Sequence, residues 1–84
     1  MKELIAVTEA RYHSGHRLRL RFSDGREKIV DFTPWLRGDV FKPLRDMKFF
    51  KKFFIAGGTV CWPNGADVAP ETLYEAQGVS ASAA

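Results

Sequence analysis

The sequence contains a single cysteine, Cys61, among its 84 residues. It therefore cannot form an intramolecular disulfide or a zinc site built from several cysteines. No apolar run approaches the roughly 20 residues that a membrane-spanning helix needs. The N-terminal residues also lack the apolar stretch and the small-residue cleavage site of a secretory signal. These absences favour a cytoplasmic protein without a membrane partner.

Lysine and arginine are missing from the C-terminal part of the chain. All 13 basic residues lie within residues 1–52, whereas the only charged residues within 53–84 are the acidic Asp67, Glu71 and Glu75. The net charge of +3 is small for a dedicated nucleic-acid-binding protein, which usually has a stronger and more clustered basic excess. One end of the molecule is therefore expected to be basic and the other acidic.

Length and composition indicate one globular domain. A content of 45% hydrophobic and 27% charged residues is typical of a folded chain. We expect a single domain over residues 1–78 and a frayed tail over residues 79–84, where the sequence is VSASAA. Because so short a domain buries only about 60% of its unfolded surface, dimerisation would add stability.

Strict alternation of arginine with apolar residues in RLRLRF predicts a half-buried strand over residues 17–22. A strand over residues 4–13 precedes it, with Ile5 and Val7 on one side and Leu4, Ala6 and Tyr12 on the other. A returning strand over residues 26–32 follows a loop of either two or three residues. The three-residue loop, 23–25, is favoured because it pairs apolar residues with apolar residues and arginines with acidic residues across the strands. The expected pairs are Leu18–Val30, Arg21–Glu27 and Arg17–Asp31.

The second half of the chain predicts a further hairpin and two short helices. Residues 40–41 are expected to be extended, and Asp46 to cap a helix over residues 47–52. Gly57-Gly58 suits a tight hairpin loop that pairs Ile55 with Val60, and both side chains are expected to be buried. Pro70 is expected to begin a final helix that ends near Gln77. The predicted fold class is α+β: antiparallel hairpins of about five short strands packed with two short helices.

Three sequence motifs resemble those of a known family: FSDG…VDF over residues 22–32, VFKPLRD over 40–46 and TVCWPNGADVAPETLYE over 59–75. They are similar to the bacterial domain-of-unknown-function family 2442, and the resemblance extends from about Ile5 to Glu75. It implies a small α+β domain without established catalytic residues. It also implies a protein partner encoded by a neighbouring gene, in a toxin–antitoxin-like or regulatory pair. The helix-turn-helix of some longer members has no counterpart in this sequence.

An excess of large aromatic residues is the strongest indication of an interaction surface. Phe49, Phe50, Phe53 and Phe54 are too many rings for so small a core, so that Phe54 or Phe49 should lie at the surface. The candidate interaction surface is therefore Phe49 and Phe54 together with Cys61, which should share the face of Phe54. Complete burial of all four rings is the alternative. The sequence predicts a protein partner or a homodimer.

Other residue groups support a site less well. Trp62, Asn64 and Asp67 in WPNGAD could present polar groups to a ligand, but a structural turn explains the same residues. Arg17, Arg19 and Arg21 could contact phosphates and make the chain a nucleic-acid-binding regulator, which is the alternative function. Glu27 and Asp31 would neutralise that face.

His13 and His16 lack the further ligands that a metal site needs, and Cys61 has no neighbouring base. We therefore expect no metal, no cofactor and no enzymatic activity.

Overall fold

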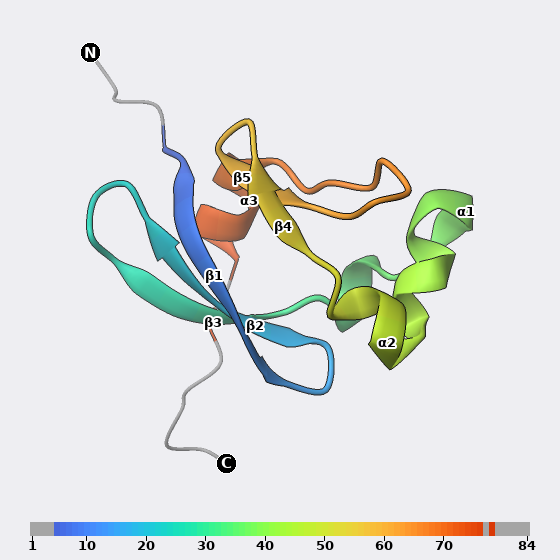
Figure 1. Cartoon of the computed structure of the whole chain (residues 1–84). Helices are drawn as coiled ribbons and strands as arrows, with labels where there is room; N and C mark the ends of the chain where they lie inside the picture. The colour runs from blue at the N-terminus through green and yellow to red at the C-terminus, as the bar shows by residue number, and fades with distance from the viewer. Residues whose placement is uncertain (1–4, 77, 79–84) are drawn as a thin grey trace.

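The computed structural model describes residues 5–76 and 78. The first half of the chain contains an antiparallel three-stranded sheet (Figure 1). Its order is β1-β2-β3. The strands are β1 (Val7–Ser14), β2 (Arg17–Phe22) and β3 (Glu27–Asp31). The buried face of this sheet carries much of the core, and its other face carries most of the charge of the hairpins.

The register of β2 against β3 confirms the three-residue loop. Leu18 pairs with Val30, and Gly25 adopts a φ of 90°, which lies in the left-handed region that glycine tolerates. The Phe22 N–H donates to the Arg26 carbonyl at 2.8 Å, which closes the loop. The predicted pairs Arg21–Glu27 and Arg17–Asp31 are also present in the ladder.

The predicted division of the first strand into two faces is wrong. Val7 pairs with Phe22 and Tyr12 with Leu18, so that both lie on the core side of the sheet. An irregularity of the register between Val7 and Glu9 inserts one residue, and an inserted residue reverses the alternation beyond it. The strand begins at Val7, and Leu4 lies outside the described residues.

Short helical turns connect the sheet to the second hairpin: η1 (Thr33–Trp35), α1 (Gly38–Phe41), η2 (Lys42–Arg45) and α2 (Met47–Phe50). The predicted extended conformation of Val40 and Phe41 is therefore wrong. Two adjacent apolar residues do not distinguish a strand from a helical turn. The helical turn lets Phe41 pack on the core beside the fully buried Leu44, three residues later.

The predicted cap of α2 is confirmed. The Asp46 carboxylate accepts a hydrogen bond from the Lys48 N–H at 3.1 Å, and α2 begins at the next residue, Met47. This bond satisfies one of the free N–H groups of the first turn. The helix ends at Phe50, two residues earlier than predicted.

The second hairpin consists of β4 (Phe54–Ala56) and β5 (Thr59–Cys61). Its loop confirms the prediction, since Gly57 and Gly58 have φ values of 59° and 78° and Ile55 pairs with Val60. The expected burial of Ile55 is wrong: its exposed fraction is 38%, whereas that of Val60 is 0%. The pair shares a face, but only β5 lies over the core, while β4 is the outer strand of the hairpin.

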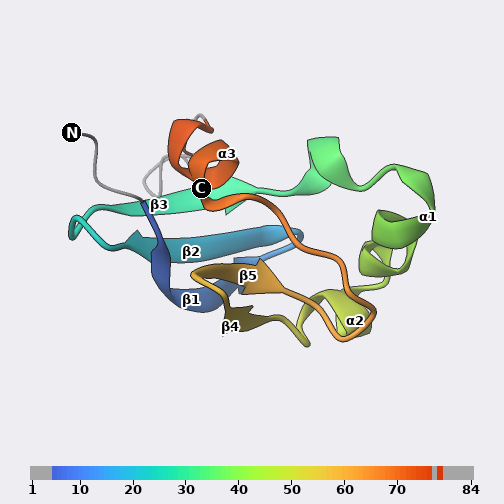
Figure 2. The ribbon, with the colours of Figure 1, turned by 90° about the horizontal axis from the view of Figure 1, so that it is seen from above.

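The last helix, α3 (Pro70–Glu75), begins at the predicted proline. Leu73 is fully buried and Tyr74 is half-buried. The predicted end at Gln77 and the tail over residues 79–84 lie outside the described residues. Figure 2 shows α3 beside β3 and the β4–β5 hairpin beside β1.

Aromatic rings from three separate segments meet in the core. Phe32 follows β3, Phe50 ends α2 and Trp62 follows β5, and each is at most 1% exposed. Their ring centroids lie 5.7 to 5.8 Å apart. The Trp62 Nε1–H donates to the Phe50 carbonyl at 2.8 Å, so the indole also satisfies the end of α2. These contacts fix the end of α2 and the end of β5 in the core. Strand β4, which connects the two in the chain, lies at the surface.

Candidate functional site

An exposed apolar surface lies on β4 and the neighbouring end of β1. Phe54 has an exposed fraction of 45%, Ile55 of 38% and Tyr12 of 37%. Strands β1 and β4 are in contact, and β4 follows α2 in the chain (Figure 1). The Tyr12 ring packs against the Phe50 ring at the end of α2. We call these three residues and the exposed Lys51 and Lys52 the β4 surface.

Of the residues that the sequence assigns to an interaction surface, the structure brings two together. Phe54 and Cys61 pair across the hairpin and share a face. Phe49 is partly buried and packs against the core instead. Tyr12 and Ile55 were missed by sequence reasoning, because their exposure depends on which elements cover β1 and β4.

Cys61 is a poor nucleophile in this position. Its partly buried thiol donates to the Ala56 carbonyl at 3.5 Å. Partial burial, with a contribution from the negative charge of Asp67, raises the pKa of the Cys61 thiol. The thiolate is the reactive form, so this environment keeps the sulfur protonated and supports a packing role.

Lysines lie at one end of the β4 surface. The segment over residues 47–56 carries Lys48, Lys51 and Lys52 and no acidic residue, and all three lysines are exposed. Within residues 5–76 and 78, none of these lysines forms an ion pair. The Lys51 ammonium lies 4.7 Å from the centroid of the Tyr12 ring, within range of a cation–π interaction. The β4 surface is therefore apolar at its centre and positive at the end nearest α2.

The WPNGAD turn uses its polar groups within the chain. The Asn64 side-chain carbonyl accepts from the Ala66 N–H at 3.1 Å, and its amide donates to the Val40 carbonyl at 2.8 Å. Trp62 is buried, and Asp67 forms an isolated bridge with Cys61. Asn64 thus joins the turn to α1, and this geometry supports a structural turn over a ligand site.

Each arginine of β2 has a carboxylate partner. Arg17 lies 3.6 Å from Asp31, Arg19 lies 3.0 Å from Glu27, and Arg21 lies 3.6 Å from Glu9. Although Arg21 faces Glu27 in the ladder, Glu27 pairs diagonally with Arg19. Arg19 and Arg21 also border a hollow on the outer face of the sheet, but their carboxylate partners Glu27 and Glu9 line it as well and oppose phosphate binding there.

The two histidines lie at opposite ends of the first hairpin loop without sharing a ligand geometry. His13 Nδ1 lies 2.9 Å from the Ser14 hydroxyl, and His16 Nε2 lies 3.1 Å from the Arg45 carbonyl. The His16 ring also packs 5.0 Å from the Phe50 ring. Across the part of the chain that the structure describes, no group of three or more His, Cys, Asp or Glu side chains could hold a metal ion.

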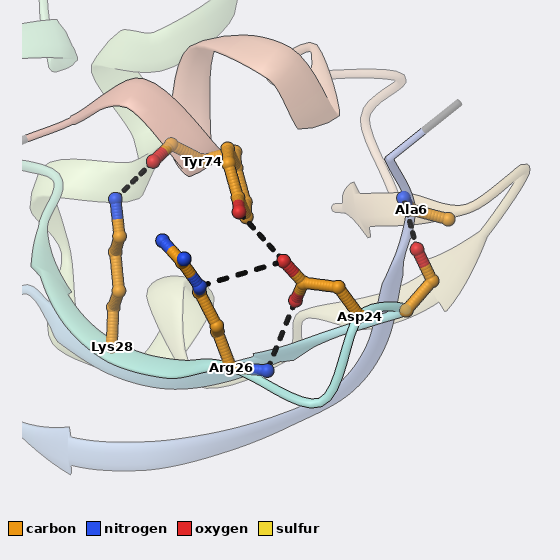
Figure 3. A network of polar contacts seen from close by, with 6 residues as sticks. Ala6, Asp24, Arg26, Lys28 and Tyr74 are labelled. Atoms are coloured by element: carbon orange, nitrogen blue, oxygen red, sulfur yellow. Dashed lines mark hydrogen bonds and ion pairs between the residues drawn. The ribbon is translucent and has the colours of Figure 1, made fainter. Parts of the chain in front are cut away.

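A polar network between α3 and the first sheet was not foreseen from the sequence (Figure 3). The Tyr74 hydroxyl donates to the Asp24 carboxylate at 2.6 Å, and the Arg26 N–H donates to the same carboxylate at 3.0 Å. These bonds lower the pKa of Asp24, while the carboxylate raises the pKa of Tyr74. Lys28 Nζ donates to the carbonyls of Tyr74 and Ala76 at the end of α3. At neutral pH the Asp24 carboxylate is therefore ionised and the Tyr74 phenol is neutral. This hydrogen bond suits a structural role in which it holds α3 against the first sheet.

Residues 7–78 match a family described as protein of unknown function, DUF2442. The chain belongs to this family. The match covers most of the sequence and confirms the resemblance indicated by its motifs. No curated protein and no solved structure matches the chain. No helix of the described residues in this DUF2442 protein is long and apolar enough to cross a membrane.

Proposed function

We propose that this DUF2442 protein is a non-catalytic protein-interaction module whose contact surface is centred on β4. The observation that carries the proposal is the exposure of Phe54 and Ile55 on the two faces of the outer strand β4, together with the exposure of Tyr12 on β1, which contacts β4. Apolar side chains that gather at the surface of a soluble domain usually mark an interface. Aromatic residues are also enriched at the centres of interfaces.

A two-gene toxin–antitoxin-like or regulatory pair is the setting that we propose for this contact. The support is the family resemblance, so the product of the adjacent gene is the first partner to test. The alternative of a nucleic-acid-binding regulator has less support, because Arg17, Arg19 and Arg21 each lie within 4.0 Å of a carboxylate. We therefore propose no second function.

Phe54→Asp provides the direct test. We expect the wild-type chain to form either a complex with the adjacent gene product or a homodimer, detected by size-exclusion chromatography with light scattering. The substitution should weaken that complex by about 2 kcal/mol or more, the usual cost of losing a central aromatic contact. Thermal unfolding followed by circular dichroism would establish that the variant is folded.

Val40→Asp is the matched control. Val40 is 51% exposed on α1, so this variant introduces the same charge at an exposed apolar position of another element. It should leave the complex intact. A chain that stays monomeric and binds no adjacent gene product would overturn the proposal, and so would a complex that survives Phe54→Asp. Salt-sensitive binding of duplex DNA by a chain without a protein partner would overturn it in favour of the alternative function.

A further inference from the structure

Strand β4 has an unpaired edge. Among the residues that the structure describes it pairs only with β5, and the hairpin closes with Ala56 opposite Thr59 around the two-residue loop. Hydrogen-bonded and non-hydrogen-bonded pairs alternate along an antiparallel ladder, so the backbone N–H and C=O of Ile55 point away from β5. Among the described residues, no backbone hydrogen bond joins Ile55 to another element. These groups are free to pair with an added strand.

Apart from its short length of three residues, the strand lacks the features that usually protect an edge. The residues of β4 include no charge and no proline, and its register with β5 is regular, without a bulge. All three residues are exposed. The edge is therefore accessible, and the side chains of Phe54 and Ile55 could pack against those of an added strand.

The positive charge of the lysines near β4 indicates which kind of segment could pair with its free edge. Lys51 and Lys52 immediately precede the β4 region and, among the described residues, have no acidic partner. The cation–π contact with Tyr12 holds the Lys51 ammonium beside the end of the strand. A second copy of the chain would bring the same lysines and another net charge of +3, which opposes self-pairing. An acidic segment meets the complementary charge.

We propose that the unpaired edge of β4 accepts an extended, acidic segment of a partner protein as an added strand. The partner's apolar side chains pack beside Phe54 or beside Ile55, which lie on opposite faces of the strand, and its carboxylates lie at the end that meets Lys51 and Lys52. This inference rests on the proposed function, because it names the partner chemistry of the same surface. Main-chain hydrogen bonds provide affinity in this mode of recognition, and side chains provide specificity.

The test uses the full chain and two fluorescein-labelled peptides, one of alternating valine and glutamate and one with lysine in place of glutamate. Fluorescence anisotropy should show binding of the acidic peptide that weakens with salt, and no binding of the basic peptide. Lys52→Glu should weaken binding of the acidic peptide. Lys42→Glu makes the same charge change on η2 and should have a much smaller effect.

Ile55→Pro tests strand addition directly. Proline removes the outward N–H but none of the hydrogen bonds between β4 and β5, and edge strands tolerate it. It should weaken binding of the acidic peptide about fivefold or more, as expected for one lost hydrogen bond. If Ile55→Pro fails to fold by circular dichroism, Lys52→Glu against Lys42→Glu still decides the charge requirement.

The possible failures are distinguishable. If neither peptide binds while Phe54→Asp still disrupts the complex with the adjacent gene product, the acidic-strand inference is overturned and the proposed function stands. Equal binding of both peptides, or full binding by both Ile55→Pro and Lys52→Glu, also overturns the inference. A homodimer that Ile55→Pro dissociates would overturn it in favour of a second copy as the occupant. A chain without any partner would remove both proposals.

Discussion

Trp62→Phe should destabilise this protein more than the same substitution at its other tryptophan, Trp35. Trp62 is 1% exposed, and its Nε1–H donates to the Phe50 carbonyl at 2.8 Å. Phenylalanine cannot donate this bond, so a buried carbonyl at the end of α2 loses its partner. An unpaired buried polar group costs about 1–3 kcal/mol. The smaller ring loses apolar burial worth ~1 kcal/mol.

The expected loss is therefore about 2–4 kcal/mol in the free energy of unfolding, a large share of the 5–15 kcal/mol typical of a whole domain. Urea denaturation followed by circular dichroism would measure it. Trp35→Phe is the matched control, since Trp35 is only partly buried and its indole N–H donates no hydrogen bond within the described part of the chain. It should cost about 1 kcal/mol. Equal losses in the two variants would refute the role assigned to the indole N–H.

Three further predictions concern backbone geometry, pH and capping. Gly58→Ala should destabilise the fold more than Gly57→Ala in urea denaturation: both glycines have positive φ, but only at Gly58 would the new Cβ lie 3.2 Å from another side chain. Because the pKa of Asp24 is lowered in the folded state, its contribution to stability is present above the unfolded pKa of about 3.8 and lost as the pH falls through the folded value. Tyr74→Phe removes the largest cause of that shift, so stability should be lost at a higher pH during acid titration; an unchanged acid limb would contradict the assignment. Asp46→Ala should cost about 1 kcal/mol through loss of the helix cap, and Asp46→Asn should retain most of it in the same urea assay.

Local chemistry made much of the fold predictable. The alternation in RLRLRF and the positive φ available to Gly25 together favour a single register of β2 and β3, since a slip of one residue would expose every apolar side chain. The same reasoning holds for Gly57-Gly58, for the Asp46 cap and for Pro70 at the start of α3. In each of these cases the cause lies within a few residues of its effect.

The candidate surface was only partly predictable. The number of phenylalanines indicates that one of them must be exposed, but Phe49 and Phe54 are equivalent until the position of α2 on the core is known. The exposure of Ile55 likewise depends on β4 being the outer strand of its hairpin. Val60, its partner across the hairpin, is fully buried.

Residues close in sequence therefore determined the strands, the turns and the helix caps of this protein, because dihedral preferences and cross-strand pairing act over short distances. Tertiary structure alone decided the irregularity that turns Tyr12 toward α2, the helical conformation of α1 and the contact between Tyr74 and Asp24, 50 residues apart. Burial depends on which elements come to lie over a residue, and that arrangement forms only when the whole chain packs around Phe32 and Trp62.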